Sequence, residues 1–154
     1  MELVSFENPV FVAYAIAAAI CVLKVNGQSW ITIYRLMKIG GGFASPEDAN
    51  QGMFNPEPRP GQLDPDDYVD RSRRMHRNDL ENIPGFWIAG FLFVLTDPPL
   101  WVAQILFFGF VILRGLHFFI YMTARSHEAR GTVFTPTSMI TLGMAAAVLW
   151  HALT

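Results

Sequence analysis

Long apolar runs separated by polar stretches dominate the pattern of this chain. They cover residues 10–36, 82–96, 100–124 and 132–153. A helix that crosses the hydrocarbon of a bilayer needs about 20 predominantly apolar residues. The second run approaches that length once the amphipathic segment 69–81 is added, so that the span covers 69–96. The pattern therefore predicts four membrane-spanning helices.

Only helices or closed barrels can span lipid, and no alternating ten-residue strand pattern is present. With 52% hydrophobic and 16% charged residues, the composition is not that of a soluble domain. The segment MELVSFENP lacks the basic region of a secretory signal, so we expect the first run to be retained as a span. The predicted fold is an all-α integral membrane protein, a four-transmembrane-helix bundle formed by residues 1–154 as a single domain.

The connections between the spans are marked by proline and glycine. A polar, proline-rich loop of residues 37–68 separates the first two spans and is predicted to be either structured turns or flexible. Asp97-Pro98-Pro99 predicts a tight turn between the second and third helices. Pro84-Gly85 predicts a kink in the second helix, and Pro136 is expected near the start of the fourth, where proline is tolerated.

The basic residues are distributed unevenly between the loops. Seven of them flank the first loop and two lie in the third, whereas the second loop and both termini have none: Arg35, Lys38, Arg59, Arg71, Arg73, Arg74 and Arg77, then Arg125 and Arg130. The positive-inside rule therefore places both basic loops in the cytosol. The net charge of -2 and the absence of a basic tail give no indication of nucleic-acid binding.

The segment that leads into the second apolar run gathers most of the charge. It has the sequence DRSRRMHRNDLENIPGF over residues 70–86. At about 100° per residue, four of its side chains fall within roughly 80° of one helix face. We call this set the polar stripe; its members are Arg71, Arg74, Asn78 and Glu81. Arginine binds carboxylates bidentately and glutamate can receive an ammonium group, so the stripe suits a polyanionic ligand that also carries an amine.

The same segment allows other interpretations. Asp70, Asp79 and Arg77 lie off or at the edge of the polar stripe and are candidate partners for neighbouring helices. Alternatively, the whole segment is an ordinary solvated helix start in which acids and bases alternate. Entry of this helix into a bilayer favours the ligand site, because ionisable groups near the apolar region face the bundle interior or a water-filled cavity.

A second candidate face lies on the third span, where Arg114, His117 and Tyr121 are spaced i, i+3, i+7. An arginine at mid-helix costs about 2.5–3.5 kcal/mol on insertion scales, so it needs a partner or a ligand. Either acids of neighbouring helices satisfy Arg114, or the three side chains point at one ligand. Lys24 in the first span is expected to snorkel towards the interface.

No metal site is predicted. The single cysteine, Cys21, lies in an apolar run and is expected to be a buried, inert thiol. No HxxH or carboxylate-histidine spacing supports a metal, so no ligand role is expected for His127 or His151.

These residues carry a resemblance to the MAPEG family, the membrane-associated proteins of eicosanoid and glutathione metabolism. The strongest matches are VDRSRRMHRNDLENI at 69–83, FASPEDA at 43–49 and RGLHFFIY at 114–121; YRL at 34–36 and ARGTVF at 129–134 are weaker ones. The resemblance covers nearly the whole chain. It is closest to the microsomal glutathione transferase branch, to which the microsomal prostaglandin E synthase is related.

The resemblance implies a homotrimer that binds glutathione between adjacent subunits near the cytosolic face. By motif position, the implied glutathione contacts are Arg74, Asn78, Glu81, Arg114, His117, Tyr121 and Arg130. Arg130 would also stabilise the thiolate, with Asp48 as its carboxylate partner. Arg35 would reach the ligand from the adjacent subunit, although KIGGGF is about two residues longer than the spacing in the family. Phe134 would stack on the ligand.

The implied activity is conjugation of glutathione to apolar electrophiles, with reduction of lipid hydroperoxides. One alternative is a glutathione-dependent isomerase of a lipid endoperoxide, but Gly131 and Phe134 stand where the prostaglandin synthase carries serine and tyrosine. Two further alternatives are a lipid-binding scaffold and a small transporter. The scaffold would not need a thiolate stabiliser, and the transporter would need charges that cross the bilayer. The expected location is the bacterial inner membrane or the endoplasmic reticulum, with the active site facing the cytosol.

Overall fold

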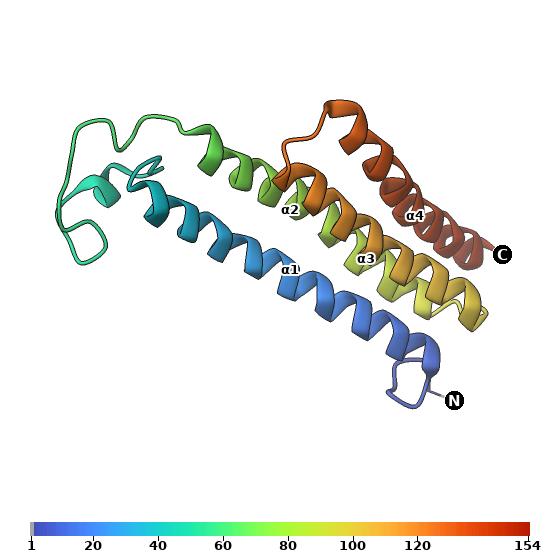
Figure 1. Ribbon diagram of the computed structural model, residues 1–154. Helices are drawn as coiled ribbons and strands as arrows, with labels where there is room; N and C mark the ends of the chain where they lie inside the picture. The colour runs from blue at the N-terminus through green and yellow to red at the C-terminus, as the bar shows by residue number, and fades with distance from the viewer. Residues whose placement is uncertain (1) are drawn as a thin grey trace.

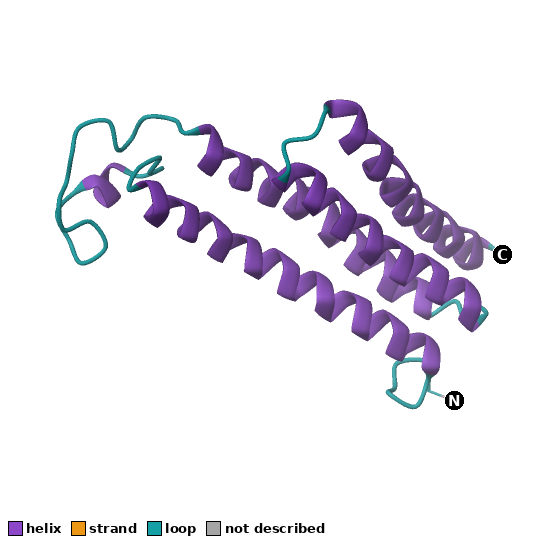
Figure 2. Cartoon of the chain, in the orientation of Figure 1, coloured by secondary structure: helices purple, strands orange, loops and turns teal. Residues whose placement is uncertain are grey.

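The computed structural model describes residues 2–154, in which every regular element is a helix (Figure 1). Its elements are α1 (Pro9–Ile39), the 3₁₀ helix η1 (Pro46–Ala49), α2 (Asp67–Val94), α3 (Leu100–Met122) and α4 (His127–Leu153). No strand forms in the described residues, as Figure 2 shows, apart from one isolated bridge between Gly52 and Asn55. The all-α prediction is confirmed.

Three of the helices are long and apolar enough to cross a membrane: α1, α3 and α4. α2 is of similar length but falls short in apolarity, because its N-terminal half carries the polar stripe. Many large apolar side chains on the outside of the bundle are exposed, among them Leu23, Ile88, Ile112 and Leu149. A soluble monomer rarely exposes so much apolar surface.

α2 and α3 form the centre of the bundle. Each of them contacts the other and both outer helices, whereas α1 and α4 share no contact in the described chain and lie on opposite sides (Figure 1). The core between the central helices is aromatic: the rings of Phe86 and Phe110 stack with centroids 4.0 Å apart. Tyr14 fastens α1 to this core, since its hydroxyl donates to the Trp87 carbonyl at 2.8 Å.

The helix ends follow from local sequence. Asn8 begins α1 by accepting from the Val10 amide at 2.9 Å, and Pro9 follows at the first helical position. Gly40 ends the same helix in the left-handed conformation, with φ of 59°. Asp66 caps α2 by accepting from the amides of Tyr68 and Val69. As predicted, Asp97-Pro98-Pro99 lies in the tight turn between α2 and α3.

The loop between α1 and α2 consists of structured turns. The side-chain amides of Asn55 and Gln62 exchange two hydrogen bonds, of 3.0 and 2.9 Å. Arg59 donates to the carbonyls of Ile39 and Gly40 at 2.6 and 3.1 Å, which satisfies the end of α1. Of the two predicted states of this loop, the structure supports the ordered one.

The predicted start of the last helix was wrong. α4 begins at His127, five residues before the apolar run at 132, because Ser126 caps it by accepting from the Ala129 amide at 3.3 Å. The polar first turn concealed this start. Pro136 therefore lies inside the helix rather than near its start, and Arg130 belongs to the helix rather than to a loop. In α2, Pro84 also lies inside the helix, which continues beyond it to Val94.

We predict that Phe86→Ala destabilises the bundle. Phe86 is fully buried, so the truncation leaves a cavity between α2 and α3 that costs about 2 kcal/mol or more. Ile88→Ala, at an exposed position two residues further along the same helix, is the matched control and should cost far less. Equilibrium unfolding in mixed detergent micelles measures both. Equal losses for the two variants would contradict this description of the core.

Candidate functional site

A buried ionic cluster ties three helices together at the centre of the molecule. Its middle is the fully buried Asp79 of α2, which forms ion pairs with Arg114 of α3 and Lys24 of α1. The Gln28 side-chain amide, one turn after Lys24, donates to the same carboxylate. The prediction that Asp79 pairs with neighbouring helices is confirmed. The expectation that Lys24 snorkels is wrong, because its ammonium group turns inward to Asp79.

Helical spacing explains why this carboxylate is buried. The core positions of the N-terminal part of α2 follow each other at intervals of three or four residues: Val69, Ser72, Met75, Asp79, Ile83 and Phe86. Asp79 therefore continues the apolar face of the helix, while the polar stripe lies beside it. Lys24 and Gln28 are four residues apart on α1 and so reach the same point. Apolar periodicity was the signal in the sequence that could have identified Asp79.

The charges of the cluster do not cancel. Two cations, Lys24 and Arg114, share the single carboxylate of Asp79. Arg114 is fully buried, and its Nε and Nη1 atoms have no partner within the described chain. Burying charge is costly unless every charged group is paired. The two unpartnered nitrogens of Arg114 are therefore unused hydrogen-bond donors inside the cluster.

The polar stripe meets this cluster at one point. Asn78 accepts from Arg114 Nη2 at 2.9 Å, which links the stripe to α3. At the start of α2, Arg71 and Arg74 donate to the two oxygens of Asp67 at 2.6 and 2.7 Å. The hydrogen bond from Arg74, followed by that from Arg71, lowers the pKa of the Asp67 carboxyl. Glu81, the last member of the stripe, is exposed.

A second group of candidate residues lies where α3 meets α4. The rings of His117 and Tyr121 stand edge to face with centroids 5.0 Å apart. The Arg130 guanidinium of α4 lies 4.9 Å from the centre of the Tyr121 ring. Phe134 follows Arg130 by one turn and is half-buried. His117 itself is buried, and its Nδ1 atom has no partner in the described residues.

Arg35 and Asp48 are not brought to this group within the single chain. Arg35 is buried: it donates to the Tyr68 carbonyl at 2.5 Å and to Met122 Sδ at 3.2 Å, and it lies over the Tyr68 ring. Asp48 lies in η1, and no ion pair of residues 2–154 joins it to Arg130. Sequence analysis missed Lys24 and Gln28 as members of the central cluster.

Comparison with known proteins places these observations in one family. The model of the MAPEG family matches residues 12–150. Microsomal glutathione S-transferase 1 of Bos taurus is 40% identical over 144 residues, which cover 93% of this chain and 91% of that protein. The Homo sapiens protein of the same name is 36% identical over the same shares. Prostaglandin E synthase of Homo sapiens is 32% identical over 147 residues, or 95% of this chain and 92% of its own length. With its long apolar helices and a family match over most of its length, this chain belongs to the MAPEG family.

Proposed function

We propose that the protein is a membrane-bound glutathione transferase that activates glutathione as a thiolate and conjugates it to apolar electrophiles. The observation that carries the proposal is the grouping of His117, Tyr121 and Arg130 where α3 meets α4. These side chains supply a donor, a hydroxyl and a fixed cation at one place. The similarity to proteins named glutathione S-transferase supports glutathione as the ligand.

The start of α2 supports the carboxylate-binding part of the site. Arg71 and Arg74 already hold one carboxylate, that of Asp67, at 2.6 and 2.7 Å. We propose that a glutathione carboxylate takes the place of Asp67 on Arg74. Asn78 and Glu81 continue the same helix face, and Glu81 would receive the glutathione ammonium group. Arg114 would contribute through Asn78, to which its Nη2 atom donates at 2.9 Å.

The proposed chemistry requires only a lowered thiol pKa. A fixed cation favours the thiolate over the thiol, and Arg130 is that cation. The sulfur then attacks the electrophilic carbon, and the leaving group departs with its electron pair. With a lipid hydroperoxide, the sulfur takes the terminal oxygen and releases an alcohol; a second glutathione converts the resulting sulfenic acid to the disulfide and water. Phe134 would stack on the ligand one turn from Arg130.

We also propose that α2 is a fourth span and that the protein assembles into the homotrimer that the family resemblance implies; the exposed charges of α2 support a subunit interface. Arg74, Arg77 and Glu81 are exposed in the single chain. In a spanning helix such groups must face a protein partner or a water-filled cavity. A subunit interface beside the stripe provides both, and it would let Asp48 and Arg35 of one subunit reach the ligand of the next. Arg35 would then have to give up its hydrogen bond to the Tyr68 carbonyl and its contact with the Tyr68 ring.

Isomerisation of a lipid endoperoxide is the second candidate, favoured by the similarity to prostaglandin E synthase. Three assays of the purified protein separate the candidates: conjugation of an aryl halide, reduction of a lipid hydroperoxide, and turnover of an endoperoxide. The proposal expects glutathione-dependent conjugation above the uncatalysed rate. Endoperoxide turnover without conjugation would replace the transferase by the isomerase, and no glutathione-dependent activity in any assay would overturn both.

We predict that Arg130→Leu lowers conjugation at neutral pH by about 10²–10³, the usual loss when one donor to an anion is removed. The thiol pKa of bound glutathione should rise, so a higher pH should partly restore the rate. Glutathione affinity should change less, because Arg74 remains. Thiolate absorbance followed against pH measures the shift.

Arg125→Leu is the matched control, since Arg125 is exposed in the turn just before α4. The thiol of glutathione bound to this variant should titrate like that of glutathione bound to the unaltered protein. If the Arg130→Leu titration also superimposes on that of the unaltered protein, Arg130 does not stabilise the thiolate.

The four-span arrangement predicts that the α1–α2 loop and the α3–α4 turn share the cytosolic side. In a Cys21→Ala background, Glu57→Cys and Arg125→Cys should react with an impermeant maleimide from that side, and Asp97→Cys only from the other. Glu57 is exposed and does not cap α1, unlike Arg59. Labelling of Glu57→Cys and Asp97→Cys from the same side would mean that α2 does not span.

A further inference from the structure

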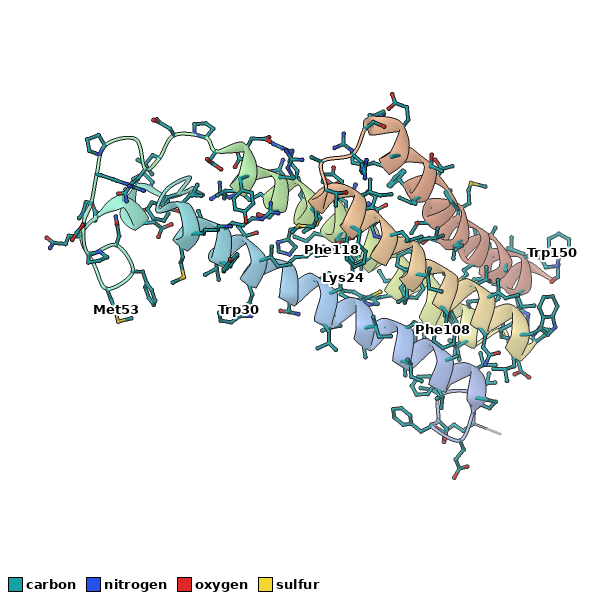
Figure 3. The ribbon with its side chains drawn as sticks, in the orientation of Figure 1. Lys24, Trp30, Met53, Phe108, Phe118 and Trp150 are labelled. Carbon is teal, nitrogen blue, oxygen red and sulfur yellow. The ribbon has the colours of Figure 1, made fainter. Side chains whose placement is uncertain are left out.

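A cavity of about 360 Å³ lies between α1 and α3, on a different flank of α3 from His117 and Tyr121. Most of its lining is apolar and includes Ile20, Val111 and Phe118. Lys24 and Arg114 are its charged residues. Figure 3 shows Lys24 and Phe118 close together in the middle of the molecule, and the ammonium group lies 5.7 Å from the centre of the ring.

The polar end of the cavity has an excess of positive charge. Lys24 and Arg114 share only the carboxylate of Asp79, and the structure shows no other acid paired with either of them in residues 2–154. The Nε and Nη1 atoms of the fully buried Arg114 have no partner in that part of the chain. One further negative charge beside Lys24 would balance the charges of the cluster.

The rest of the cavity is open and apolar. Lys24 is the middle residue of α1, so the charged end lies at the depth where a spanning helix is surrounded by hydrocarbon. Ile20 and Phe119, which also line the cavity, are exposed. Gly27 of α1 and Gly115 of α3 both line the cavity, and a Cβ atom added at either would meet no atom within 4 Å. A ligand entering here must therefore join a negative group to an apolar chain.

We propose that this cavity binds a long-chain carboxylate from the surrounding bilayer, separately from glutathione. The carboxylate lies against the partly exposed Lys24 at the end of the cavity that Arg114 also lines. The hydrocarbon chain leaves between Ile20 and Phe119 into the lipid. A small inorganic anion would satisfy the charge but leave the apolar lining empty, and a neutral lipid would leave the charge unbalanced.

Oleate is the probe for this site, and methyl oleate, which lacks the charge, is its neutral counterpart. Displacement of the fluorescent fatty acid cis-parinarate from the purified, detergent-solubilised full chain reports binding of either one. We expect one saturable oleate site per subunit and at least tenfold weaker binding of the ester, because a charge-assisted hydrogen bond corresponds to about ten- to a hundredfold in affinity. Equal affinities for acid and ester would overturn the proposal.

Two variants locate the site. Lys24→Gln removes the charge while leaving Asp79 paired with Arg114, and should weaken oleate binding at least tenfold. Gly115→Leu fills open space in the cavity and leaves every charged residue in place, and should do the same. Gly143→Leu is the matched control: a Cβ there also meets nothing, but Gly143 lies on α4 and does not line the cavity. It should bind oleate like the unaltered protein.

Further results would overturn the proposal. Unaltered oleate binding in a folded Gly115→Leu protein would place the fatty acid elsewhere. Displacement of oleate by saturating glutathione in the unaltered protein would place it in the proposed glutathione site. A change of oligomeric mass in Gly115→Leu would mean that a second copy of the chain fills the cavity. None of these results bears on conjugation, which is assayed separately.

Discussion

The arrangement of the helices depends on the ion pairs and the hydrogen bond that the Asp79 carboxylate accepts. It lies in α2 with no exposure and receives a lysine and a glutamine from α1 and an arginine from α3. In a bilayer, the lipid tails around the bundle are as apolar as its core. The hydrophobic effect therefore gives the helices little preference for one another. A directional ion pair fixes the register of α1 and α3 on α2, which apolar packing alone leaves less determined.

Arg114 divides the interior into two regions with different chemistry. One side of its guanidinium meets Asn78 and the polar stripe, where charged groups are exposed and the proposed glutathione site lies. Arg114 is also one of the residues that line the apolar cavity between α1 and α3. Because Asp79 holds Arg114, the same buried pair positions both regions. Substitution of Arg114 would therefore disturb stability together with binding, which is why Arg130 and Lys24 are the better probes.

Apolar run length was enough to predict the four helices. The charge pattern indicated the polar stripe, and its role as a ligand site stays a prediction. The start of α4 was misplaced because its first turn, which contains Glu128 and Arg130, is as polar as a loop, and only the cap at Ser126 marks it. Asp79 could be inferred as a helix partner, but not which partners it takes. Lys24 and Arg114 are 90 residues apart in the chain, and no local pattern shows that they share one carboxylate.

The most direct test of this account is the free energy of unfolding of Asp79→Asn in mixed detergent micelles. Removing the shared partner leaves the fully buried Arg114 and the partly buried Lys24 without their carboxylate. A broken buried pair costs about 3–5 kcal/mol. Adding Lys24→Gln should recover part of that loss, because one uncompensated cation is then gone. Asp70→Asn, which breaks only the partly exposed pair with Arg73, should cost about 1 kcal/mol or less. If Asp79→Asn were no more destabilising than Asp70→Asn, the buried carboxylate would not organise the bundle.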